Sequence, residues 1–207
     1  MADPNNPLLC TEGLPRFDEI KPEHIEPAIL QVLRESEEKI SKIEANITPT
    51  WDGLIKPLEE IGRPFEYAWS PIGHLLNVKN SKELREEQQK MLPIVVQFGL
   101  RMGQSKPIYD GLTAIREGPE WDRLNDAQKR VIELKIRDAK LSGVGLYGDP
   151  KKRFNEITTE LSQIGNDFSN NVLDSTKAYE FIVTEKNDTL GWPNSLLQLS
   201  SQSYNQA

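Results

Sequence analysis

The stretch PEHIEPAILQVLRESEEKISKIEA, residues 22–45, decides the fold class because its apolar residues recur at the spacing of an α-helix. Pro22 and Pro27 fit the entry or the first turn of such a helix, where a missing backbone N–H costs little. Charged and polar residues fill most of the other positions. The pattern therefore predicts an amphipathic helix with one buried stripe, formed by Ile25, Ile29, Val32, Leu33, Ile40 and Ile43.

A second amphipathic pattern begins just after Thr50, which is placed to cap a helix. Its apolar residues alternate steps of four and three, which resembles a heptad seam that is too short to demand a coiled coil. An interior proline costs a helix roughly 3 kcal/mol, so we expect a kink or a break near Pro64 and Pro71. The seam consists of Leu54, Leu58, Ile61, Phe65, Ala68, Ile72 and Leu75.

Polar capping residues mark the starts of the later helices. Ser81 caps a helix that Pro93 should bend, and Ser105 starts a short one. Asn125 caps a strongly periodic segment through Leu141. A last long pattern opens at residues 149–150, and we expect its apolar residues to point inward; they are Phe154, Ile157, Leu161, Ile164, Phe168 and Val172.

Together these patterns predict an all-α, or nearly all-α, antiparallel bundle of roughly six to eight helices. The one exception is AYEFIVT, residues 178–184, whose aromatic and β-branched content predicts a minor strand. The sequence shows no internal repeat, low-complexity tract or flexible linker. We therefore expect a single helical domain over residues 1–207.

The composition is typical of a soluble, acidic chain. The 207 residues carry a net charge of −7, which argues against nucleic acid or an anionic membrane as a partner. No run of 18 apolar residues is present, and the N-terminus lacks the pattern of a signal peptide. Cys10 is the only cysteine, which excludes an internal disulfide and suits a reducing compartment. These features predict a cytoplasmic protein.

His74 is the first candidate for chemistry, because it is one of only two histidines and lies in WSPIGHLLNVKNSKELR, residues 69–85. The other, His24, is in a separate helical segment. A catalytic zinc site commonly needs three protein ligands, often with two histidines in HExxH, and no HExxH or CxxC is present. Convergence of both histidines with Cys10, or a peptide-contacting role for His74, remain alternatives. The favoured interpretation is a hydrogen-bonded or half-exposed residue of a helix.

The segment Gly143-Val144-Gly145-Leu146-Tyr147-Gly148 spells GxGxxG. A dinucleotide site needs this motif between a strand and a helix, so that the helix N-terminus meets the pyrophosphate. Here a helical pattern precedes it. Gly143 is therefore expected to close that helix in the left-handed conformation, and no nucleotide cofactor is expected.

Seven blocks of the sequence carry a family resemblance. In order they are LPRFDEIKPEHIEPAI, TWDGLIKPLEE, WSPIGHLLNVKNSKELR, LPIVVQFG, IRDAKLSGVGL, KKRFNEITTELSQIGNDFSNNVLD and GWPNSLLQL. These blocks, in this order, resemble the N-terminal region of the thimet oligopeptidase family, closest to its bacterial oligopeptidase A branch, and the resemblance covers residues 5–207.

The resemblance implies a function for a longer protein. Family members are zinc endopeptidases that cut short peptides in a channel between two largely helical lobes. Their zinc ligands and catalytic glutamate lie on an HExxH helix and a downstream glutamate, which have no counterpart here. The resemblance thus implies no catalytic, cofactor-binding or metal-binding residue in this chain. It implies a channel-wall lobe in which the stretch around His74, residues 69–85, is a joint between two helices. It also implies short peptides and a catalytic lobe as partners, and zinc in the parent enzyme.

The sequence stops inside what resembles a continuing helix, at SSQSYNQA. We therefore expect a fragment of a longer enzyme, by construction or proteolysis, or the product of a truncated gene. The alternative from another class is a naturally catalysis-free helical module that binds peptides or a partner. Self-association through the apolar segment from Trp192 to Tyr204 is a further expectation.

Overall fold

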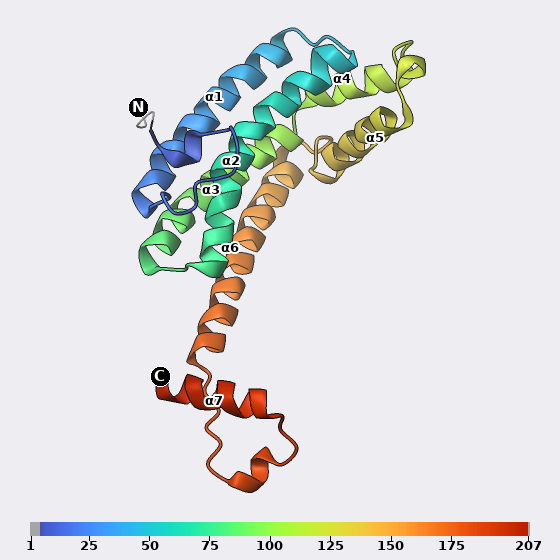
Figure 1. Ribbon diagram of the computed structural model, residues 1–207. Coiled ribbons are helices and arrows are strands. Elements are labelled where there is room, and N and C mark those ends of the chain that lie inside the picture. Colours follow the sequence, from blue (N-terminus) through green and yellow to red (C-terminus); the bar gives the residue numbers. More distant parts are fainter. Residues whose placement is uncertain (1–4, 207) are drawn as a thin grey trace. The chain divides into compact units, whose positions relative to one another are not determined.

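The computed structural model describes residues 5–206, and side-chain burial for residues 5–205 (Figure 1). The prediction of an all-α fold with six to eight helices is confirmed. The α-helices in the described residues are α1 (Ile25–Ala45), α2 (Lys56–Val78), α3 (Lys82–Gly103), α4 (Lys106–Glu117), α5 (Asp126–Leu141), α6 (Gly148–Ala178) and α7 (Asn194–Gln206). None of them is long and apolar enough to cross a membrane.

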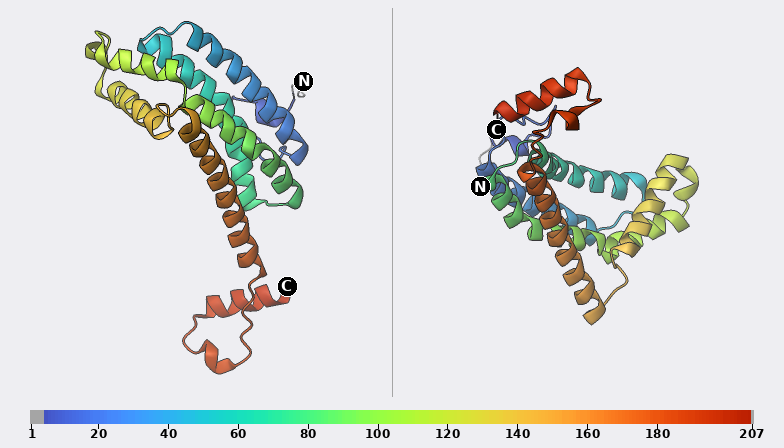
Figure 2. Two further views of the ribbon diagram at one scale, coloured as in Figure 1. Left: turned by 180° about the vertical axis from the view of Figure 1, so that it is seen from behind. Right: turned by 90° about the horizontal axis from the view of Figure 1, so that it is seen from below.

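The chain divides into two compact units, Met1–Asn166 and Asp167–Ala207. In the first unit α1 packs against both α2 and α3, and α4 packs against α5 (Figures 1 and 2). Only three residues separate α2 from α3, and so short a connection makes neighbouring helices antiparallel. The second unit contains the end of α6 and α7.

Two apolar clusters form the core of the first unit, and Phe98 of α3 packs against both. The first joins the N-terminal segment to α1, α2 and α3; it contains Leu8, Ile25, Ala28, Ile29, Val32, Leu33, Ala68, Ile72, Leu75, Leu84 and Met91. The second joins α1 and α2 to α4 and α5; it contains Ile40, Leu54, Ile55, Leu58, Ile61, Ile108, Leu112, Ile115, Leu124, Ile132 and Ile136. Most of the two stripes predicted from residues 22–75 lie in these clusters.

The predicted caps are confirmed. Ser81 Oγ accepts a hydrogen bond from the Leu84 N–H over 3.2 Å, and so begins α3. Asn125 Oδ1 accepts one from the Gln128 N–H over 2.9 Å, and Gln128 Oε1 accepts one from the Asn125 N–H over 3.0 Å. This reciprocal pair satisfies two of the amides that a helix start leaves without partners.

The break expected near Pro64 and Pro71 is wrong, because α2 runs through both prolines. Pro71 is itself buried, and Ala68 and Ile72 beside it are 0% exposed against α1 and α3. Burial of this face offsets the hydrogen bonds that the prolines remove. The kink expected there and the bend expected at Pro93 stay predictions.

The minor strand expected at residues 178–184 is also wrong. Ala178 is the last residue of α6, and the residues after it have no regular structure up to residue 185. Tyr179 and Phe181 are 73% and 75% exposed. A strand is stable only when a partner strand satisfies its backbone groups, and residues 5–206 contain no strand that could pair with this segment.

The largest departure from expectation concerns α6, which has no buried residue. Phe154 is half-buried, and the other apolar residues expected to point inward are exposed; these are Ile157, Leu161, Ile164, Phe168 and Val172. Periodicity shows that a helix has an apolar face, but not which surface covers that face. The expected inward orientation is therefore wrong.

Candidate functional site

The joint predicted around His74 is confirmed. His74 is an exposed residue in the last turns of α2, and residues 79–81 link α2 to α3. Its ring lies 5.0 Å from the ring of Phe17, centroid to centroid, at an interplanar angle of 54°. His74 thus makes an ordinary contact between side chains of the N-terminal segment and α2.

His24 and Cys10 are not brought to His74 as a metal site. His24 Nδ1 accepts a hydrogen bond from the Lys21 N–H over 3.2 Å, and the Cys10 thiol lies 3.6 Å from the Glu12 carbonyl oxygen. No group of three His, Cys, Asp or Glu residues within the described part of the chain is arranged to hold a metal ion. Residues 5–206 therefore do not supply the three protein ligands that a catalytic zinc needs.

The GxGxxG segment is a helix end, as predicted. Gly143 has a φ of +84°, the left-handed conformation, and follows Ser142, the C-cap of α5. Its N–H donates to the Lys140 carbonyl over 3.1 Å, and the Val144 N–H donates to the Ala139 carbonyl over 3.1 Å. This pair of bonds is the Schellman motif. Because these amides serve the helix end, they are not available to cradle a phosphate.

Replacing Gly143 with alanine is expected to lower the free energy of unfolding by about 1–2 kcal/mol, since a Cβ disfavours positive φ. The new Cβ would also lie 2.9 Å from Leu146 Cδ1. Gly145→Ala is the matched control, because its φ is not positive and no atom lies within 4 Å of an added Cβ. Urea unfolding followed by circular dichroism measures the difference; equal stability of the two variants would contradict the helix-end role.

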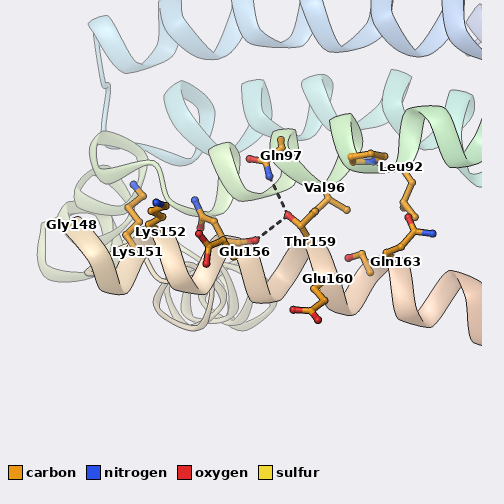
Figure 3. Close-up of a pocket in the computed structure, with 13 residues that line it drawn as sticks. Leu92, Val96, Gln97, Gly148, Lys151, Lys152, Glu156, Thr159, Glu160 and Gln163 are labelled. Atoms are coloured by element: carbon orange, nitrogen blue, oxygen red, sulfur yellow. Dashed lines mark hydrogen bonds between the residues drawn. The ribbon is translucent and has the colours of Figure 1, made fainter.

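A groove of about 920 Å³ lies between α3 and the first half of α6 (Figure 3). Its volume is at the upper end of the range for ligand pockets. The α3 wall is mostly apolar, with Leu92, Pro93, Val96 and Gln97. The α6 wall is polar and consists of Gly148, Lys151, Lys152, Asn155, Glu156, Thr159, Glu160, Ser162 and Gln163.

Gln97 and Thr159 connect the two walls, and Figure 3 shows them pointing toward one another. Gln97 Nε2 donates to Thr159 Oγ1 over 3.1 Å, and the Thr159 hydroxyl donates to the Asn155 carbonyl over 2.9 Å. The single hydroxyl proton is thus committed to the helix backbone, so Thr159 is an acceptor toward α3.

Gln104 fixes one end of the groove. Its side chain is largely buried at the end of α3, and its Nε2 donates to Asn155 Oδ1 over 2.7 Å and to the Ser142 carbonyl over 3.0 Å. It therefore ties α3 to α6 and to the turn after α5. Further along α6, the buried Asn166 Nδ2 has no hydrogen-bond partner among the described residues, which leaves one donor unsatisfied next to the groove.

The groove offers hydrogen-bonding groups of the kind that pair with a peptide backbone. Amide side chains supply both donors and acceptors, and an extended peptide presents both N–H and C=O groups. The lining contains no histidine or cysteine. Ser162 donates its hydroxyl proton to the Thr158 carbonyl over 3.0 Å, so no base activates it in this arrangement. The arrangement suits binding of a polar chain.

The sequence analysis did not predict that these residues line a groove. A signal was present, because α6 carries small polar residues at helical spacing on the face opposite its apolar residues. The apolar residues of α6 predicted a face, but its polar residues alone do not show which surface they meet. The polar residues are Asn155, Thr159, Ser162 and Asn166.

An ionic cluster joins α1, α3 and α4 within the first unit. Arg101 Nη1 and Nη2 donate to the two Glu44 carboxylate oxygens over 2.8 and 2.6 Å, and Arg101 Nη2 also donates to Glu37 Oε1 over 3.0 Å. Ser105 donates its hydroxyl proton to Glu44 as well. The hydrogen bonds from Arg101 hold the pKa of the Glu44 carboxyl below its ordinary value, although partial burial opposes the shift.

Comparisons with known proteins match nearly the whole chain. The family profile described as Neurolysin/Thimet oligopeptidase, N-terminal domain, matches residues 29–151. The "Probable cytosolic oligopeptidase A" of Arabidopsis thaliana is 40% identical over 198 residues, which are 96% of this chain and 28% of that protein. "Oligopeptidase A" of Escherichia coli (strain K12) is 39% identical over 193 residues, 93% of this chain and 28% of that protein.

Another relative is named after organelles rather than the cytosol. The "Organellar oligopeptidase A, chloroplastic/mitochondrial" of Arabidopsis thaliana is 40% identical over 96% of this chain and 25% of that protein. The chain thus spans between a quarter and three tenths of the length of the relatives it matches. Since the profile covers more than half of the 207 residues and the identity extends over almost all of them, the chain belongs to the neurolysin/thimet oligopeptidase family.

Proposed function

We propose that this chain is the non-catalytic N-terminal part of a zinc-dependent oligopeptidase that cleaves short peptides. The observation that carries the proposal is the identity of about 40% to oligopeptidases over 96% of the chain. In that family the resemblance places the zinc ligands on an HExxH helix, a motif that this sequence lacks. The metal and the chemistry would come from polypeptide beyond the region that these residues match.

The contribution of this chain is to shape the path of the substrate. As one N-terminal domain, residues 1–207 would wall the channel. The groove between α3 and α6 supports this role, because Gln97 and Asn155 present amide groups of the kind that pair with a peptide backbone. The cytoplasm is the proposed compartment. The name of one Arabidopsis thaliana relative supports it, and the name of the other keeps an organelle as the alternative.

The isolated chain is expected neither to hydrolyse peptides nor to bind zinc stoichiometrically, because catalytic zinc needs three protein ligands. The test joins the chain through Ala207 to the part of Escherichia coli Oligopeptidase A that follows its matched region. The fusion should cleave an internally quenched peptide and lose this activity with a chelator. The chain alone and the Escherichia coli part alone are the controls. Chelator-sensitive cleavage by the chain alone would overturn the proposal.

A catalysis-free binding module is the second candidate, and the groove itself is the observation that favours it. Such a module would bind short peptides without any further polypeptide. Fluorescence anisotropy with labelled short peptides distinguishes the two candidates, with Gln97→Ala as the groove variant. Micromolar binding that Gln97→Ala weakens favours the module. Absence of binding by the chain, together with an active fusion, favours the peptidase domain.

A further inference from the structure

The exposed apolar face of α6 is the least explained surface of the first unit. Ile157, Leu161 and Ile164 are 39%, 62% and 55% exposed, and steps of four and three place them on one face of the helix. We call these three residues the apolar stripe. Single exposed apolar residues are ordinary, but a contiguous patch marks an interaction surface.

The orientation of α6 in the first unit is the reverse of the usual one. A helix on the surface of a bundle normally turns its apolar face to the core and its polar face outward. Here the polar face, with Asn155 and Thr159, faces α3, and the apolar stripe does not. The hydrogen bonds from Gln97 and Gln104 hold it in that orientation. The apolar stripe is therefore matched to a surface other than α3.

The two edges of the apolar stripe differ in chemistry. Arg153, Glu156 and Glu160 lie along one edge, where Arg153 Nη1 is 3.4 Å from Glu156 Oε2, whereas Thr158 and Gly165 lie along the other. An added Cβ at Gly165 would meet no atom within 4 Å, so a neighbour can approach that edge closely. The sequence continues the apolar spacing with Phe168 and Val172 and the acidic edge with Asp167 and Asp174.

This asymmetry disfavours a second copy of the chain packed antiparallel on the apolar stripe. A two-fold axis between antiparallel helices brings the same edge of both together. That edge carries Glu156 and Glu160 against the single positive charge of Arg153, so two net-negative edges would meet. Juxtaposed like charges oppose association. A partner with an apolar face and a basic edge matches the surface better.

We infer that the apolar stripe of α6 is the docking surface for the catalytic part of an oligopeptidase, through an apolar face bordered by Lys or Arg. This rests on the proposed function. Relatives carry about 70% of their length outside the matched region, so a partner surface of this kind is available in one polypeptide. The polar face of α6 then lines the groove while its apolar face joins the two parts.

The fusion with the Escherichia coli part tests the inference. A photo-reactive benzophenone amino acid is placed at Leu161, or at Leu141, a matched leucine on α5 that is 69% exposed. Position 161 should cross-link to residues beyond 207 of the fusion, and position 141 should not. Cross-links from 161 to another copy of residues 1–207, or none at all, overturn the inference.

A substitution gives a second measurement. Leu161→Glu should lower the melting temperature of the fusion and leave that of the isolated chain unchanged, because the side chain is exposed in the isolated chain. Leu141→Glu should change neither. Equal effects of Leu161→Glu on both proteins would contradict docking. The peptidase assay reports separately on the proposed function. An inactive fusion that still cross-links from position 161 would contradict the proposed function but not the docking surface. An active fusion without that cross-link would contradict the docking surface but not the proposed function.

Discussion

Replacing Ile115 with alanine is expected to lower the free energy of unfolding by about 3–4 kcal/mol. Ile115 lies on α4 at 0% exposure, inside the second apolar cluster with Ile40, Leu54 and Ile132. Removing its branched side chain loses the burial of its methyl and methylene groups and leaves a cavity that close-packed neighbours fill only partly. No other single substitution considered for this chain should cost more.

The measurement is urea unfolding at constant temperature, with Ile94→Ala as the matched control. Ile94 is the same residue type on α3 but is 41% exposed, so its truncation should cost less than about 1 kcal/mol. The melting temperature of Ile115→Ala should fall by roughly 6–16 °C, the shift typical of chains of this length. A loss no larger than that of Ile94→Ala would show that α4 is not part of the cooperative core.

Local signals in the sequence were sufficient to predict where the helices of the first unit begin and end. Ser81 and Asn125 act through hydrogen bonds to amides three residues away, so a short window contains both partners of each bond. Gly143 could be assigned because the backbone alone sets its conformation. Such features depend on neighbours in the sequence, which reasoning from one sequence can see.

Features that depend on distant partners were not predictable in the same way. Pro64 and Pro71 signalled a break, but the gain from burying the α2 seam lies in contacts with other helices. Residues 178–184 have the composition of a strand, but a strand also needs a partner. The apolar face of α6 was recognised correctly as a face, while its direction depends on which surface covers it.

The same distinction holds for the candidate site. Histidine is rare in this sequence, which made His74 a candidate for chemistry, yet among the described residues its ring packs against Phe17. The groove residues Gln97 and Asn155 are common polar residues, and they become a site only when α3 and α6 lie side by side. The family relationship, by contrast, was readable from ordered blocks of sequence and is confirmed by the comparisons.

Replacing Arg101 with alanine is expected to lower the free energy of unfolding by about 2–3 kcal/mol at pH 7. Arg101 donates to both Glu44 and Glu37, and the Glu44 side chain is only 17% exposed. Hydrogen bonds to charged groups contribute about 1.5–3 kcal/mol each, and less where water reaches them, as at Glu37. The variant also leaves the Glu44 carboxylate half-buried, with Ser105 as its remaining hydrogen-bond partner among the described residues.

The pH dependence of the stabilisation by Arg101 identifies Glu44 as its partner. The pKa of Glu44 is lowered in the folded protein from its ordinary value of 4.5. A carboxyl whose folded pKa is lowered contributes stability that is complete above its unfolded pKa and is lost as the pH falls through the folded pKa. The coupling energy between Arg101→Ala and Glu44→Gln in a double-mutant cycle should therefore be constant from neutral pH to about pH 5. It should decline as the pH falls below the ordinary pKa of a glutamate, 4.5.

Arg101→Lys separates charge from geometry in this cluster. Lysine keeps the positive charge but lacks the planar fork that reaches both Glu44 oxygens. The free energy of unfolding of Arg101→Lys should lie between those of the wild type and Arg101→Ala. If Arg101→Ala and Glu44→Gln are additive at neutral pH, the two side chains do not stabilise one another. If their coupling persists unchanged well below pH 4, the stabilising partner of Arg101 is a group other than the ionised Glu44 carboxylate.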